Sequence, residues 1–144
     1  MTASRTSALL LLSALTAVSL VGCAIGDALQ NEKASEFPTA ADVVERWEKS
    51  APWLPDDATD VLTREAPGAD PAVLLATSSA PLDTEQCVEV ERFSAPAYSV
   101  EGAPDPFVDT VFACGDWAVI PADGGWYGWT PNHPDEKAAS EQIG

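Results

Sequence analysis

The chain has 144 residues, the size of one ordinary domain, and its 7 basic and 23 acidic side chains give a formal net charge of −16 at pH 7. Nucleic acid has to be neutralised by lysine and arginine. Because the few basic residues are scattered along this acidic chain, we exclude nucleic acid as a partner. Hydrophobic residues make up 46% of the sequence and five are tryptophan, which favours a packed core over a disordered acidic tail.

The first 23 residues have the layout of a secretory signal, in which one cation, Arg5, precedes an apolar run over residues 8–20. The run closes with Leu20-Val21-Gly22-Cys23, which resembles the lipobox of bacterial lipoproteins. The resemblance implies cleavage before Cys23 and acylation of its thiol. Two acyl chains would hold the protein on the extracytoplasmic face of the cell membrane. The alternative, an uncleaved membrane helix, is disfavoured because the run is shorter than the roughly 20 residues that span a bilayer.

Four segments follow from this interpretation. We expect a signal peptide over 1–22, a lipidated N-terminus and tether over 23–38, a globular domain over 39–131 and a flexible tail over 132–144. The tether is small, polar and aperiodic, and the tail is polar. Loss of the signal peptide removes one cation and no acidic residue, so the mature chain carries a formal charge of −17.

An amphipathic helix of about three turns is expected at the start of the globular domain. Thr39 and Asp42 form a capping-box-like start, and Pro52 ends the pattern. The apolar positions in between recur at i, i+3 and i+4 spacing: Ala40, Val43, Val44, Trp47 and Ala51.

Strands are expected after Trp53, where Pro and Gly separate short runs rich in Val, Thr, Phe and Trp. The expected strands are Thr59–Arg64, Val73–Thr77, Cys87–Phe93, Thr110–Ile120 with a break near Gly115, and Trp126–Thr130. Residues 71–78 stay open between strand and helix, because Asp70-Pro71 is also a good helix start. Residues 121–125 are the expected hairpin connection. The predicted fold class is α+β, a small antiparallel sheet of about four or five strands with one N-terminal helix and one disulfide.

The disulfide is expected between Cys87 and Cys114, because lipidation of Cys23 leaves these two as a pair in an oxidising compartment. Closing this loop contributes about 3.6 kcal/mol on the chain-entropy estimate. The alternatives are a metal site and a catalytic thiol. A structural zinc needs four ligands and a catalytic thiol needs a base, yet the only histidine is His133 in the polar tail.

Catalytic motifs are missing from the sequence. It contains no Gly-x-Ser-x-Gly elbow, phosphate-binding loop, dinucleotide fingerprint or His-Glu-x-x-His pair. Acidic groups suited to a hard cation are Asp56, Asp57 and Asp60, and Asp105 with Asp109. A solvated turn in which Asp57 caps the next segment is the simpler interpretation. We therefore expect no catalytic residue, no metal and no cofactor.

The candidate binding residues are aromatic. Trp126, Tyr127 and Trp129 lie on one expected strand, where neighbouring side chains point to opposite faces. Core packing is the ordinary role of such rings, but an exposed strip would stack on sugar rings. The irregular stretch from Ser94 to Phe107 is either a binding loop or a surface connection.

The sequence therefore predicts a membrane-anchored, non-catalytic binding or interaction module, whose partner is a cell-wall glycan or an envelope protein. The alternative is a cell-envelope hydrolase that uses paired carboxylates. The segments Cys114-Gly115-Asp116-Trp117 and Gly125–Pro131 resemble small lipoproteins of unknown function from actinobacteria. That resemblance implies no particular activity.

Overall fold

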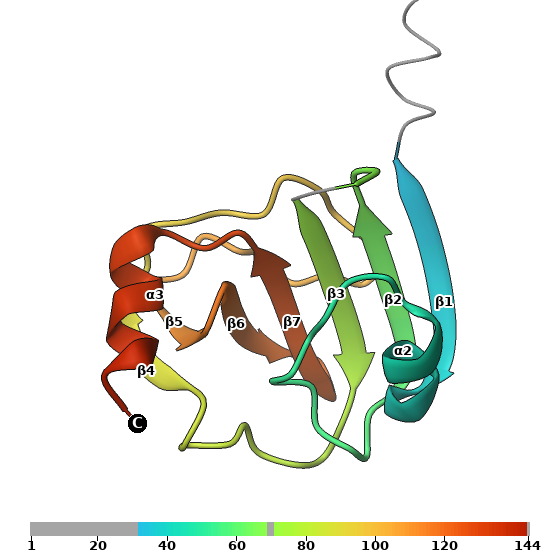
Figure 1. Ribbon diagram of the computed structural model, residues 1–144, viewed down its shortest axis with the longest axis horizontal. Coiled ribbons are helices and arrows are strands. Elements are labelled where there is room, and N and C mark those ends of the chain that lie inside the picture. Colours follow the sequence, from blue (N-terminus) through green and yellow to red (C-terminus); the bar gives the residue numbers. More distant parts are fainter. Residues whose placement is uncertain (1–31, 69–70, 144) are drawn as a thin grey trace, which may run out of the picture.

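The computed structural model describes residues 32–68 and 71–143. The expected signal peptide and the lipidation site at Cys23 lie outside these residues. Within them the chain forms an α+β domain with one antiparallel sheet and two helices (Figure 1). The elements are β1 (Lys33–Thr39), α2 (Ala40–Arg46), β2 (Thr59–Glu65), β3 (Ala72–Thr77), β4 (Val88–Glu91), β5 (Thr110–Cys114), β6 (Trp117–Ala122), β7 (Gly125–Thr130) and α3 (Pro134–Glu141).

The sheet has seven strands in the order β1-β2-β3-β7-β6-β5-β4, and every neighbouring pair is antiparallel. The predicted class is confirmed, but the sheet is larger than the four or five strands expected. One reason is that β1 lies in the expected tether. Another is that the expected strand Thr110–Ile120 is two strands, joined by a turn at Gly115, whose φ of +60° suits glycine. Residues 72–77 are a strand, which decides the alternative that the sequence left open.

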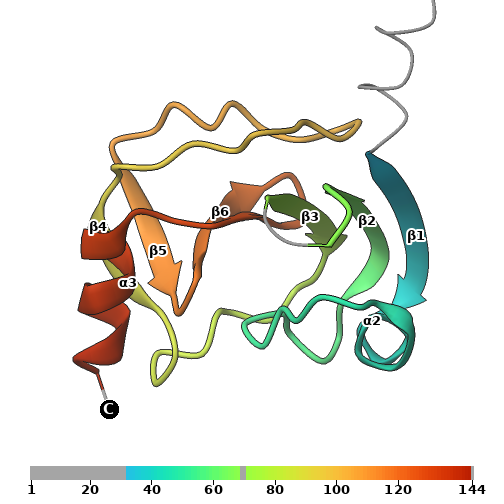
Figure 2. The ribbon, with the colours of Figure 1, turned by 45° about the horizontal axis from the view of Figure 1, so that its top comes forward.

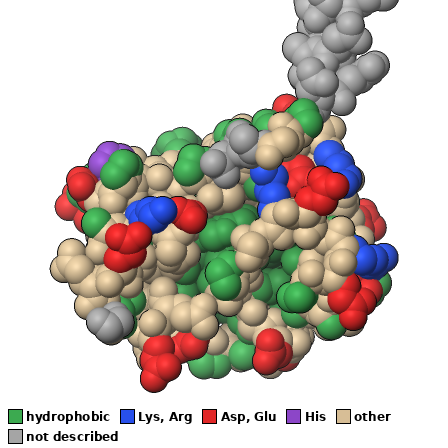
Figure 3. Space-filling model, in the orientation of Figure 1, with side chains coloured by type: hydrophobic (Ala, Val, Ile, Leu, Met, Phe, Trp, Pro, Cys, Tyr) green, Lys and Arg blue, Asp and Glu red, His purple; other side chains and the backbone are tan. Residues whose placement is uncertain are grey.

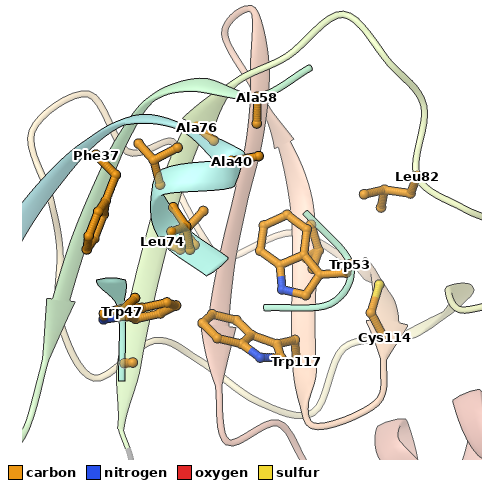
Figure 4. Close-up of a cluster of buried hydrophobic side chains, with 14 of the residues drawn as sticks. Phe37, Ala40, Trp47, Trp53, Ala58, Leu74, Ala76, Leu82, Cys114 and Trp117 are labelled. Carbon is orange, nitrogen blue, oxygen red and sulfur yellow. The ribbon is translucent and has the colours of Figure 1, made fainter. Parts of the chain in front are cut away.

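Side chains on both faces of the sheet are buried. One face packs against α2 and the segment that follows it, and the other is covered by the long loop over residues 92–109 (Figure 2). The first core contains Trp47, Trp53 and Trp117, with Trp117 5.7 Å from Trp53 and 6.1 Å from Trp47 between ring centroids (Figure 4). Gly128 on β7 packs directly against Trp53. A Cβ atom at this position would come within 2.5 Å of the indole, so only glycine leaves room for the ring.

Helix α2 begins where expected but is shorter. The Thr39 side chain accepts a hydrogen bond from the Asp42 N–H and caps the helix. The helix ends at Arg46 rather than near Ala51, because Trp47 adopts an extended backbone. The buried Trp47 ring donates a hydrogen bond of 2.8 Å to Glu65 at the end of β2, so tertiary contacts take the chain out of the helix.

Both ends of the expected globular domain need correction. Lys33–Thr39 is an edge strand rather than tether, and only Phe37 of its side chains is buried. One buried ring is too little to form an alternating pattern, so hydrophobic periodicity does not reveal this strand. The expected tail contains α3, which His133 caps and in which Glu136 and Ser140 are buried. Its buried contacts are polar, so no apolar periodicity revealed them.

The Cys87–Cys114 disulfide is confirmed. Its Cα atoms lie 4.3 Å apart, and it joins the residue before β4 to the end of β5. The two thiols are therefore neither metal ligands nor a catalytic nucleophile. No helix among the described residues is long and apolar enough to cross a membrane.

Candidate functional site: an exposed patch at the base of the long loop

The three aromatic residues that the sequence nominated for binding face the interior. Tyr127 and Trp129 are each 1% exposed, and Trp126 is partly buried against Phe112. Each polar ring atom is used within the fold: Trp126 Nε1 donates to the Ala80 carbonyl, Tyr127 Oη to the Tyr98 carbonyl, and Trp129 Nε1 to Ser94 Oγ. Tyr127 and Trp129 are therefore too buried to stack on a sugar, and Trp126 is partly exposed.

The loop that covers Tyr127 explains this burial. It crosses the sheet from the β4 side towards β1 and returns (Figure 2). The hydrophobic core on this face of the sheet, which we call the second core, contains Tyr127 and Trp129. Three loop residues pack onto it: Tyr98, Val100 and Ala103. Burial raises the pKa of the Tyr127 phenol to about 12. The loop is therefore a cover for one face of the sheet along most of its length.

Exposed hydrophobic side chains gather where this loop begins and ends. Phe93 is 51% exposed, Phe107 73% and Val108 38%. They are three of the four large hydrophobic residues exposed in the described part of the chain, and the fourth, Val44, lies on α2. We call Phe93, Phe107 and Val108 the loop-base patch.

Arg92 ties the two arms of the loop together beneath the patch. Its Nε donates to the Val108 carbonyl at 2.7 Å, and one guanidinium nitrogen donates to the Ser94 carbonyl at 2.8 Å. The Arg92 backbone N–H donates to the Asp109 carbonyl at 3.0 Å. The guanidinium also lies 5.5 Å from the centre of the Phe107 ring, at cation–π distance.

The buried carboxylate of Glu136 fixes the first arm. Its Oε1 accepts from the backbone N–H groups of Phe93 and Ser94 at 2.6 and 2.9 Å. Its Oε2 accepts from the Ser94 hydroxyl at 2.7 Å and from the His133 N–H at 2.9 Å. Ser94 Oγ in turn accepts from Trp129, so α3, the loop and β7 share one hydrogen-bond network.

The surroundings of the patch are acidic. Glu91, Asp105, Asp109 and Asp135 are all exposed within two residues of a patch residue or of His133, whose ring lies 5.4 Å from that of Phe93. Figure 3 shows the histidine at the upper left beside hydrophobic and acidic side chains. The two exposed phenyl side chains thus stand on a backbone fixed by hydrogen bonds, with four exposed acidic residues close to them or to His133 along the chain, which we call the acidic rim.

The acidic turns considered as cation sites have structural roles. Asp57 accepts hydrogen bonds from the Ser78 and Ser79 hydroxyls and from the Ser79 and Ala80 N–H groups. These bonds, that of Ser78 above all, lower the pKa of Asp57. Asp105 accepts from the Phe107 N–H. The described residues contain no group of three or more side chains arranged to hold a metal ion.

The sequence analysis did not single out Phe93 and Phe107 as the rings left in solvent. Phe93 ends an expected strand, and Phe107 ends the irregular stretch. The available signal was that Phe107 follows Pro106 in a segment without periodicity, where a large ring has no strand face to occupy.

Comparisons of the chain with models of protein families, with curated proteins and with solved structures found no match.

Proposed function

We propose that the protein is a lipoprotein anchored on the extracytoplasmic face of the cell membrane, and that its domain is a non-catalytic binding module. The lipobox-like residues that end in Cys23 support the anchor. Strand β1 begins at Lys33, ten residues after Cys23. Ten residues of chain reach at most about 36 Å, so the anchor would keep the domain near the bilayer.

The loop-base patch is the observation that supports binding. Burying a phenylalanine side chain stabilises a protein by about 1.5–3 kcal/mol, and this fold forgoes part of that gain at both Phe93 and Phe107. The backbone there is held by Arg92 and Glu136, so the exposure of Phe93 and Phe107 does not result from a loose loop. Clustered exposed apolar side chains of this kind mark contact surfaces.

The alternative, a hydrolase with paired carboxylates, has no comparable support. Its acid and base would have to face each other across a cleft. Glu65 and Glu136, the two carboxylates buried in the described part of the chain, are held instead by the Trp47 indole and by the four donors around Glu136.

The anchor is tested by Cys23→Ser in the full-length protein. We expect the variant to lose acylation and to remain uncleaved at Gly22 by the lipoprotein pathway, which mass spectrometry of the membrane fraction will show. Wild-type mature protein that lacks lipid, or that begins at another residue, would refute the anchor.

The binding role is tested by extracting the wild-type lipoprotein from its own membranes in mild detergent and measuring the size of the particle that contains it. A binding module is expected to migrate as a complex larger than one chain in its micelle. Phe107→Ser is expected to shift the protein to the size of the single chain, whereas Val44→Ser, the matched exposed control on α2, is not. A wild-type protein that migrates alone contradicts the binding role.

A further inference from the structure

We propose that the loop-base patch docks onto the basic surface of a partner protein, with Phe93 and Phe107 as the apolar contact and lysine or arginine side chains of the partner facing the acidic rim. This inference rests on the proposed binding function and names the surface and the chemistry of its partner.

The charges at the patch select the partner. Glu91, Asp105, Asp109 and Asp135 are exposed within two residues of the patch or of His133, and the buried Glu136 accepts from the Phe93 N–H. The cation within the patch is Arg92, which already donates to two backbone carbonyls. Complementary potentials steer and select partners, so a surface rich in lysine and arginine fits this rim.

The same charges disfavour three other occupants. A second copy would bring a rim of the same sign against this one, which opposes a symmetric dimer through the patch. An anionic lipid surface would repel the rim, since membrane-binding surfaces carry basic residues. An anionic wall polymer would be repelled in the same way.

The rings suit a basic protein surface in a second respect. Phe107 already has the Arg92 guanidinium 5.5 Å from its centroid, and its side chain is still 73% exposed. Open phenyl faces attract ammonium and guanidinium groups, and the apolar stems of lysine and arginine can cover the rings. Because the backbone is already fixed by Arg92 and Glu136, binding would cost little ordering entropy.

The first experiment places a photoreactive benzophenone amino acid at position 107 or 93 of the full-length lipoprotein in its own cells, with position 44 as the matched control. We expect light-dependent crosslinks at 107 and 93 to one protein, and not at 44. Mass spectrometry of the joined peptides is expected to show lysine or arginine next to the crosslinked residue. Crosslinks to lipid, to glycan, to a second copy of this chain or to an acidic segment would each overturn the proposal.

The second experiment removes charge from the rim without removing the rings. In the 107-labelled protein, Asp105→Asn with Asp109→Asn is expected to lower the crosslink yield by a factor of about 2 to 10 and to weaken its dependence on salt. Asparagine can still accept from the Phe107 N–H, so the loop keeps that bond. The control is Glu85→Gln with Asp123→Asn, which removes the same charge from two exposed positions elsewhere.

The outcomes separate the two proposals. If positions 93 and 107 give no crosslink while position 44 crosslinks a protein, the chain is a binding module but this surface is wrong. If the wild-type protein migrates alone in detergent and no position crosslinks, the proposed function itself fails. Equal loss of yield in both charge variants would show that overall charge, rather than the rim, attracts the partner. That result would overturn the proposed role of the rim.

Discussion

Replacing Glu136 by alanine is the sharpest test of how the fold holds the loop-base patch. The change leaves four donors without their acceptor: the N–H groups of Phe93, Ser94 and His133, and the Ser94 hydroxyl. Glu136 is 1% exposed, and its carboxylate joins α3 to the start of the loop.

The expected loss follows from these four bonds. A hydrogen bond to a charged group contributes about 1.5–3 kcal/mol. Phe93 and His133 lie partly in solvent, where water can replace the carboxylate, so we count only the two bonds to Ser94 in full. The free energy of unfolding should therefore fall by about 3–6 kcal/mol, which lowers the Tm by roughly 10–25 °C in a domain of this size. Glu136→Gln keeps one acceptor oxygen and should lose about 1–3 kcal/mol.

Thermal and denaturant unfolding of the oxidised protein will measure these differences. Hydrogen exchange at the Phe93 and Ser94 amides gives a local readout, since both should lose protection in the alanine variant. Glu141→Gln, on the exposed side of the same helix, is the control and should stay within about 0.5 kcal/mol of wild type. An alanine variant within 1 kcal/mol of wild type, with both amides still protected, would refute the role given to Glu136.

Three further predictions concern the disulfide and the second core. Thiol labelling should find Cys87 and Cys114 blocked until reductant is added, and reduction should cost about 3.6 kcal/mol for a sequence separation of 27; labelling of the untreated protein would contradict this. Trp129→Ala should destabilise the protein by about 3–5 kcal/mol as a core truncation, and unchanged unfolding would show that the ring is not packed. Because burial raises the pKa of Tyr127 to about 12 whereas an unfolded tyrosine ionises near 10, stability should be complete below pH 10 and decline as the pH rises towards 12. In a Tyr98→Phe variant, Tyr127 is the one tyrosine left, so phenolate absorbance should appear only near pH 12, and its appearance near pH 10 would exclude the buried phenol.

The placement of the aromatic residues shows where prediction from sequence stops. Alternation along the last strand correctly put Trp126 and Tyr127 on opposite faces, because side-chain direction in a strand is a local property. Whether each face meets solvent or another layer depends on segments distant in sequence. Tyr98 covers Tyr127 from 29 residues away, and no local pattern records that contact.

Helix α3 likewise depends on contacts between residues that are distant in sequence. His133-Pro134 followed by Glu136 is a good helix start once the structure is known. The polar composition of residues 132–144 nevertheless predicted a flexible tail. The helix is held by a buried carboxylate with partners 42 and 43 residues away, rather than by an apolar face.

The sequence by itself determined the features that depend on local chemistry. Thr39 caps a helix, and the β-rich runs form strands. The expected hairpin between β6 and β7 is present, although its turn is Asp123-Gly124 rather than all of residues 121–125. The two cysteines of the domain, Cys87 and Cys114, form the expected disulfide. The signal peptide and the acylation of Cys23 are predictions of the same local kind. The tertiary structure alone decided which rings are buried and which are exposed. Pairing of β3 with β7 places Tyr127 and Trp129 at the centre of the sheet, where the loop covers them. Phe93 follows the end of β4 and Phe107 precedes the start of β5, and both remain exposed.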